Sequence, residues 1–201
     1  MATSYSKFTP EDIDALGIDI EQFYLFEQKA PVPVSARLAE TLKENLEFPL
    51  GTEKAKSELI ITPVLSELRR NNPDFFALFS GYNFNVDKSK GLTGRCDYLL
   101  TRAVRTPIIK SPIMCVVEAK NDEVDSQNAI AQCIAEMYAA QLFNTKQNNE
   151  LPIIFGATST GFEWLFMQLE GKKVKIDYTR YYLNDLPKLL SILQQIMDNF
   201  K

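Results

Sequence analysis

The chain has 201 residues, of which 45% are hydrophobic and 11% aromatic, a composition that allows one domain, or one domain with an extension, to fold alone. Its net charge of −4, from 22 basic and 26 acidic residues, argues mildly against tight nonspecific binding to DNA. It does not exclude a local basic groove. It contains no histidine, which excludes Ser-His-Asp hydrolases, histidine-dependent nucleases and histidine-bound metals, so any catalysis must use carboxylates, lysine, tyrosine or a metal that they hold.

The first fifty residues read as helical pieces separated by prolines. One helix is predicted over 19–28, ending before the Pro31/Pro33 pair, where proline restricts the preceding backbone. A second is predicted over 35–47, with Ser35 as its N-cap. We expect residues 1–50 to form a helical N-terminal extension that packs on a main domain over 51–201.

A longer helix is predicted from Thr52 to Arg70. Thr52 can cap its first turn, and Glu53 is favourably placed there beside the positive end of the helix dipole. Pro63 lies inside this helix, so a kink or a locally lost hydrogen bond is expected at that point.

The rest of the chain alternates between strand and helix patterns. Three strands are predicted first, then a helix over 125–144, then two or three strands and a closing amphipathic helix over 184–200. The predicted strands are 76–86, 94–101, 112–119, 151–157, 163–169 and a last one near 174–178. This order predicts an α/β fold with a central mixed β-sheet flanked by helices.

Location and cysteine chemistry follow from what the sequence lacks. No apolar run approaches the ~20 residues of a membrane helix, and the start, MATSYSKFTPEDID, has no secretory pattern, so a cytoplasmic protein without membrane contact is expected. Cys96, Cys115 and Cys133 are widely spaced and odd in number, which favours three reduced core thiols over a zinc site or disulfides.

The segment IMCVVEAK, residues 113–120, is the strongest chemical feature of the sequence. Its apolar, β-branched character predicts a buried strand, on which Glu118 and Lys120 share one face while Val117 and Ala119 point the other way. Removing two charges from water costs several kcal/mol per ion before they pair. Stability alone therefore does not explain a buried pair at this position, which indicates a functional role.

Asp97 is the second unusual charge, because aspartate is depleted from strand interiors. If its strand pairs with 112–119, Asp97 can reach Glu118. Two carboxylates ~4 Å apart repel by ~4 kcal/mol at an effective dielectric near ~20, and a divalent cation reverses that sign. Hard oxygen ligands with retained waters suit Mg²⁺.

Asp97 followed by Glu118-Ala119-Lys120 resembles the PD-(D/E)XK, or restriction-endonuclease-like, nuclease superfamily. The segment TEKAKSELIITPVLSEL also resembles the opening helix of nuclease domains in type I restriction subunits, and the resemblance covers about 52–180. Cys96 stands where a proline often precedes the aspartate. Related RecB-like members carry Gln-x-x-x-Tyr on the next helix, whereas here Glu136 is the fourth residue after Gln132, so no role is transferred to Tyr138.

The resemblance implies a restriction-endonuclease-like core and metal-assisted phosphodiester hydrolysis, with DNA the expected substrate. Mg²⁺, for which Mn²⁺ can substitute, would be held by Asp97, Glu118 and the Ala119 carbonyl, while Lys120 orients the attacking water. A helix glutamate often completes the acidic cluster in that family. Glu58 is the candidate, being aligned at helical spacing with the expected inward stripe of Ile61 and Leu65.

Two neighbouring polar residues receive simpler assignments. Glu67 falls on the opposite side of the helix from that stripe and is expected to be solvated. Gln132 can face the site and is kept as a candidate catalytic residue, although a polar helix face is the favoured interpretation of this residue alone.

Other interpretations stay open. Glu118 and Lys120 alone fit a solvated strand end, and Glu58 alone fits a surface charge. The main alternative function is a nuclease-fold binding or regulatory module without activity. A homodimer or a protein partner that supplies target recognition fits either function. Nucleic-acid phosphates could be met by two groups of basic residues: Arg95, Arg102, Arg105 and Lys110, and Lys172, Lys173, Lys175 and Arg180.

Overall fold

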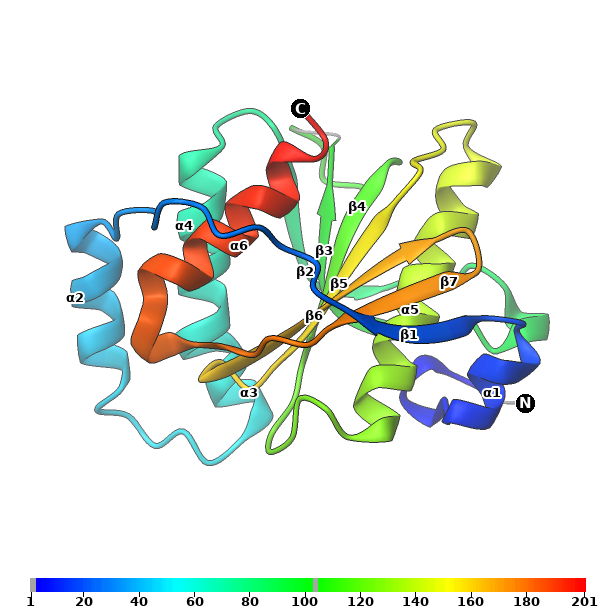
Figure 1. Ribbon diagram of the computed structural model, residues 1–201, viewed down its shortest axis with the longest axis horizontal. Helices are drawn as coiled ribbons and strands as arrows, with labels where there is room; N and C mark the ends of the chain where they lie inside the picture. The colour runs from blue at the N-terminus through cyan, green and yellow to red at the C-terminus, as the bar shows by residue number, and fades with distance from the viewer. Residues whose placement is uncertain (1–2, 103–104) are drawn as a thin grey trace.

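A computed structural model describes residues 3–102 and 105–201 of the chain. An eight-stranded mixed β-sheet crosses the molecule, with helices on both of its faces (Figure 1), as the alternation of strand and helix patterns predicts. The strands are β1 (Asp19–Phe23), β2 (Ala77–Asn83), β3 (Arg95–Thr101), β4 (Ile113–Ala119), β5 (Ile154–Ser159), β6 (Glu163–Glu170), β7 (Lys173–Asp177) and β8 (Tyr181–Tyr182). Their order is β1-β7-β6-β5-β4-β3-β2, with β8 paired to β6.

The α-helices connect and cover these strands. They are α1 (Pro10–Ala15), α2 (Ala36–Asn45), α3 (Glu53–Lys56), α4 (Thr62–Asn71), α5 (Gln127–Lys146) and α6 (Leu186–Asp198). Short 3₁₀ turns occupy Tyr5–Lys7, Lys88–Lys90 and Leu183–Asp185. Among the described residues, no helix is both long and apolar enough to span a bilayer.

Strands β2, β3 and β4 form an antiparallel meander, and α5 then carries the chain to β5, which pairs parallel to β4. In this register Tyr98 of β3 lies opposite Val117 of β4. The next position along each strand is Asp97 and Glu118, so strand pairing alone brings the two acids together.

Two apolar cores lie on opposite faces of the sheet. On one face, α2, α4 and α6 pack over residues such as Trp164 and Phe166. On the other, the long helix α5 and the N-terminal α1 pack over residues such as Val116 and Leu165. The three cysteines, Cys96, Cys115 and Cys133, are free and buried, as predicted.

The helix predicted over 19–28 is wrong. Asp19–Phe23 is a strand that pairs in parallel with β7 along its whole length, from Asp19 opposite Lys173 to Phe23 opposite Asp177. The segment includes the β-favouring residues Ile20 and Phe23. The edge of β7 supplies main-chain hydrogen bonds to it, and these outweigh its local helix propensity. The helix predicted over 35–47 is confirmed as α2, and the side chain of Ser35 caps it by accepting from Leu38 N–H at 3.1 Å.

The helical run from Glu53 to Asn71 contains a π-helical turn, Ser57–Ile61, immediately before Pro63. Proline has no N–H, so the carbonyl of Leu59, four residues earlier, loses its usual donor. The side-chain amide of Asn45 on α2 donates to that carbonyl instead, at 2.7 Å. The predicted local loss of a hydrogen bond is therefore compensated from the N-terminal segment.

Glu67 is buried, with 2% of its surface exposed, so the expectation that it is solvated is wrong. Its carboxylate accepts hydrogen bonds from the guanidinium of Arg70 and from Ser35 N–H. Burial opposes ionisation, but these donors outweigh it and lower the pKa of Glu67. The residue thus joins the start of α2 to α4.

Candidate functional site

The carboxyl end of β4 carries the candidate site, next to the start of β3. Asp97 projects across from β3 and accepts a hydrogen bond from the backbone N–H of Ala119 at 2.8 Å. Glu118 is 4% exposed, and its Oε2 is buried with no hydrogen-bond partner among the described residues. Leaving a buried carboxylate oxygen unpaired costs free energy, which marks this atom as one that a ligand could satisfy.

Lys120 and Glu118 lie on the same face of the strand, as the alternation of side chains predicts. The ammonium Nζ of Lys120 is 2.9 Å from Glu118 Oε1 and 2.9 Å from Gln132 Oε1 on α5. The amide of Gln132 in turn donates to Glu118 Oε1. Gln132 therefore faces the site, and it holds both the carboxyl and the ammonium in place.

Glu136, one turn further along α5, is a site residue that the sequence analysis did not select. It is fully buried, its Oε1 accepts from the Gln132 amide at 3.2 Å, and its Oε2 has no partner among the described residues. The signal for it was present, because Glu136 is the one charged residue in the stretch from 127 to 145.

Burial and mutual repulsion disfavour the negative charges of this cluster. Burial, and then the charge of Asp97, raise the pKa of Glu118 to about 8. Burial also raises the pKa of Asp97 and, together with the charge of Glu118, raises that of Glu136 strongly. Burial alone would lower the pKa of Lys120, but the Glu118 carboxylate outweighs it and the pKa rises, so the lysine stays charged.

The predicted inward orientation of Glu58 is wrong. Glu58 is exposed and pairs with Lys54, also exposed, at 2.5 Å. The expectation assumed uniform α-helical spacing to Ile61 and Leu65, but the π-helical turn between them widens the helix and changes its phase.

Glu53, in the first turn of α3, has the closer electrostatic link to the site. Although much of its surface is exposed, partial burial of the carboxyl raises its pKa, the charge of Lys120 opposes this, and the charge of Asp97 adds to it. Glu53 therefore feels both Asp97 and Lys120.

A cleft of about 430 Å³ opens onto Asp97 and Ala119, and α3 with the π-helical turn forms its opposite wall. Glu53 and Glu58 both line this wall, so Glu58 reaches the rim of the site. Gly81 on β2 lies across from Asp97 and has φ +61°. A Cβ there would collide with the guanidinium of Arg95, so glycine lets this arginine lie in the cleft near Asp97.

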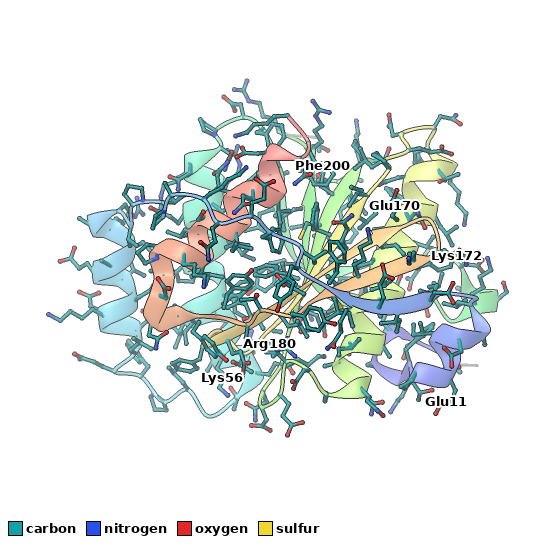
Figure 2. The ribbon with its side chains drawn as sticks, viewed as in Figure 1. Glu11, Lys56, Glu170, Lys172, Arg180 and Phe200 are labelled. Atoms are coloured by element: carbon teal, nitrogen blue, oxygen red, sulfur yellow. The ribbon has the colours of Figure 1, made fainter. Side chains whose placement is uncertain are left out.

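The loop that follows β4 is tied down on both sides. Lys56 of α3 donates to the Asn121 carbonyl, and Arg180 pairs with Asp125 at 3.1 Å. Figure 2 labels Lys56 and Arg180 at the same edge of the sheet. These anchors fix the position of Lys120, which begins the loop.

The two predicted basic groups do not form one surface around the site. Arg95 lines the cleft, but Arg105 pairs with Asp74, Lys173 pairs with Glu21, and Arg180 pairs with Asp125. Lys172 lies over the Tyr138 ring, 3.8 Å from its centroid. Most of these charges thus have local partners in this structure, and their role as phosphate contacts stays a prediction.

The donor set suits a hard divalent cation in kind, since it combines carboxylates from β3 and β4 with an unpaired buried oxygen on Glu118. In the described ranges, 3–102 and 105–201, no three acidic or thiol side chains converge closely enough to hold a metal unaided. Mg²⁺ is commonly bound by two protein carboxylates, with water and substrate phosphate as its other ligands.

No model of a known protein family matches the chain, and a search of curated proteins finds no match either.

Proposed function

We propose that this protein is a Mg²⁺-dependent nuclease of the PD-(D/E)XK type that hydrolyses phosphodiester bonds, with DNA as the expected substrate. One observation carries the proposal: Asp97 and Glu118 converge from adjacent strands beside Lys120, and Glu118 keeps a buried oxygen without a partner. The succession of helix, antiparallel meander, crossover helix α5 and parallel β5 supports it, since the resemblance depends on the same order of elements.

In this proposal Asp97, Glu118 and the Ala119 carbonyl hold the metal, and Glu53 or Glu58 on the cleft wall approaches it directly or through water. Held by these residues, a divalent ion would supply a coordinated water of lowered pKa and an electrophile for the phosphoryl oxygen. The Ala119 N–H, by donating to Asp97, fixes one carboxylate relative to the strand that carries the other.

Lys120 acts on the substrate side. Its ammonium is only 17% exposed, so its charge acts in a medium that screens it weakly and can stabilise the charge that develops on the phosphate in the transition state. Gln132 is a positioning residue, because it bonds Lys120 and Glu118 at once.

The test is cleavage of plasmid, linear and single-stranded DNA and of RNA, with Mg²⁺ or Mn²⁺ and with EDTA. We expect EDTA-sensitive cleavage that Asp97→Asn and Glu118→Gln abolish and that Lys120→Gln slows by about 100-fold or more. Glu170→Gln, an exposed acid at the far end of β6, removes the same charge and should retain full activity. Intact substrates in every reaction would refute the proposal.

A binding module without activity is the second candidate, and two observations favour it. Lys120 already neutralises Glu118 directly, and the described residues contain no group of three acids arranged around a metal. Calorimetry with Mg²⁺ separates the two functions: a nuclease should give a saturable heat of Mg²⁺ binding, of either sign, and lose it in Asp97→Asn, whereas the module should show none.

A further inference from the structure

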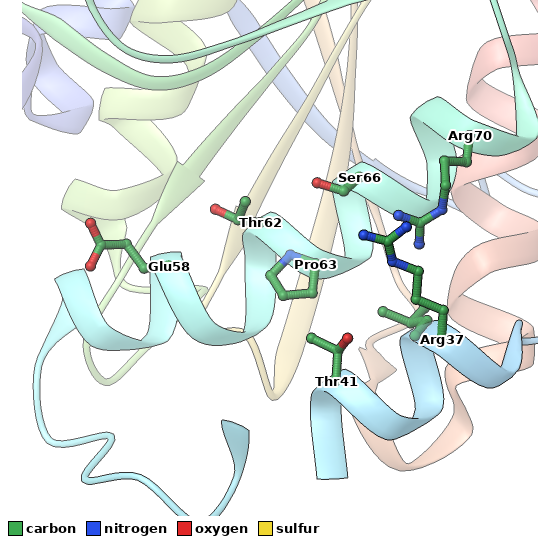
Figure 3. Close-up of a pocket in the computed structure, with 8 residues that line it drawn as sticks. Arg37, Thr41, Glu58, Thr62, Pro63, Ser66 and Arg70 are labelled. Carbon is green, nitrogen blue, oxygen red and sulfur yellow. The ribbon is translucent and has the colours of Figure 1, made fainter. Parts of the chain in front are cut away.

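A second cleft, of about 210 Å³, lies between α2 and α4 on the outer side of the helical layer. Figure 3 shows Arg37 from α2 and Arg70 from α4 directing their guanidinium groups toward one another across it. Thr41 and Ser66 add hydroxyl groups to the lining, the Thr62 hydroxyl is bonded to the Ser57 carbonyl, and Glu58 lies at the far end. This is a polar cleft with two cations at one end.

Only one of the two charges at that end has an ion-pair partner among the described residues. Arg70 is paired with Glu67, but Arg37 forms no ion pair with any residue in the described ranges. Glu58 lies at the opposite end and is already paired with Lys54. Two guanidinium groups that face each other repel, and an anion between them turns this repulsion into two charge-assisted interactions.

The chemistry of the lining favours a phosphate group as that anion. Guanidinium presents paired N–H donors that match two phosphate oxygens, and hydroxyl side chains bond the remaining ones. The Thr41 and Ser66 hydroxyls line the same cleft as the two arginines, from α2 and α4 respectively.

The position of this cleft relates it to the candidate active site. Glu58 lines both clefts, so one begins where the other ends along the same helical run. The two clefts therefore adjoin one another, and a strand of nucleic acid bound in one could continue into the other.

We propose that Arg37 and Arg70 bind a backbone phosphate of the nucleic acid, away from the bond cleaved beside Asp97 and Glu118. The assignment rests on the nuclease function proposed above. It gives a direct role to α2, which lies outside the part of the chain that resembles known nucleases.

The experiment measures binding of a fluorescent 20-nucleotide duplex and its single strand in EDTA, where cleavage is blocked, across a series of salt concentrations. Arg37→Gln is the test variant, because Arg70 also supports the buried Glu67 and its replacement endangers the fold. Lys43→Gln is the matched control: it removes the same charge from an exposed position of α2 that does not line the cleft.

We expect Arg37→Gln to weaken binding about 5- to 10-fold and to make the slope of log K against log salt shallower by about 1. Lys43→Gln should stay within about twofold of the unmodified protein with an unchanged slope. Equal binding by the two variants, in a protein that still cleaves DNA, overturns the phosphate site and leaves the nuclease function intact.

Two further outcomes identify other failures. If the protein neither binds nor cleaves any nucleic acid, the proposed function fails and this inference fails with it. If calorimetry shows that inorganic phosphate binds and that Arg37→Gln abolishes it, while no oligonucleotide binds, the cleft takes free phosphate and the nucleic-acid assignment is overturned.

Discussion

Glu118 sits in an environment that disfavours its charge, with Asp97 on one side and the buried Glu136 on the other. Lys120 and Gln132 partly offset this, yet the pKa of Glu118 remains near 8. An acid with a raised pKa stabilises the fold fully below its unfolded value of 4.5, and that stabilisation is lost as the pH rises through about 8. A cation that binds the carboxylate would reverse this penalty.

In metal-free protein we therefore expect the free energy of unfolding to fall by a few kcal/mol between pH 5 and about pH 8, since each pKa unit corresponds to about 1.4 kcal/mol. Glu118→Gln cannot ionise and should make this fall shallower, while Glu136, whose pKa is also raised, keeps its own share. Urea unfolding in EDTA measures it, with Glu170→Gln as the control that keeps the slope. An unchanged slope in Glu118→Gln contradicts the assignment.

The residue pattern identified the centre of the site but not its surroundings. Asp97, Glu118 and Lys120 stood out because charges are rare inside buried strands, and the structure does bring the three together. Glu136 was missed although it interrupts an otherwise uncharged helix. The orientation of Glu58 could not be predicted, because it depends on a π-helical turn that a uniform helical period does not reveal.

At the scale of elements, the run from α3 to α4 depends on a contact from outside itself. The carbonyl of Leu59 has no main-chain donor at Pro63, and Asn45 supplies one. Tyr98 of β3 also donates to the Ser57 carbonyl within the π-helical turn, at 2.8 Å. The wall of the candidate-site cleft is thus held both from α2 and from the sheet.

Asn45→Ala should destabilise the protein by about 1–2 kcal/mol, because it leaves the Leu59 carbonyl without its donor. Pro63→Ala restores a main-chain N–H at that position, so the same asparagine replacement should cost less in its presence. Thermal or urea unfolding of the two single variants and the double variant measures the coupling. Strictly additive effects would show that Asn45 contributes nothing through this bond.

Most elements were predictable from hydrophobic periodicity, including the three-strand meander and α5. The prediction of a helix over 19–28 failed for a clear reason: the five residues of β1, four of them exposed, carry too little local information, and their conformation is set by β7, some 150 residues later in the chain. The prediction that Glu67 is solvated failed for a related reason, since its burial depends on α2 packing over α4.

At the scale of the whole molecule, residues 3–50 contact both layers of helices. Tyr5, Phe8 and Ile13 join the core beneath α5, while Leu38 and Leu42 join the core beneath α6. Each such side chain contributes about 1.5–3 kcal/mol by burial. Complete domains are stable by only about 5–15 kcal/mol, so this segment is energetically substantial.

A chain shortened to residues 51–201 should therefore lose its cooperative thermal transition and bind a hydrophobic dye such as ANS. Circular dichroism during heating and dye fluorescence test this directly. Phe23→Ala, which alters a half-exposed ring within the same segment, should melt within a few degrees of the full chain. A sharp transition in the shortened chain at the original temperature would show that 51–201 folds independently.

The pairing of β1 with β7 has one more consequence, for the behaviour of the protein in concentrated solution. With β1 in place, the main chain of β7 has a strand on either side. Proteolysis that released the segment before residue 24 would leave β7, with its Val174 and Ile176, as an unpaired edge strand. Such an edge can pair with a strand of another molecule. Self-association of nicked protein would then grow with concentration, beginning at this strand.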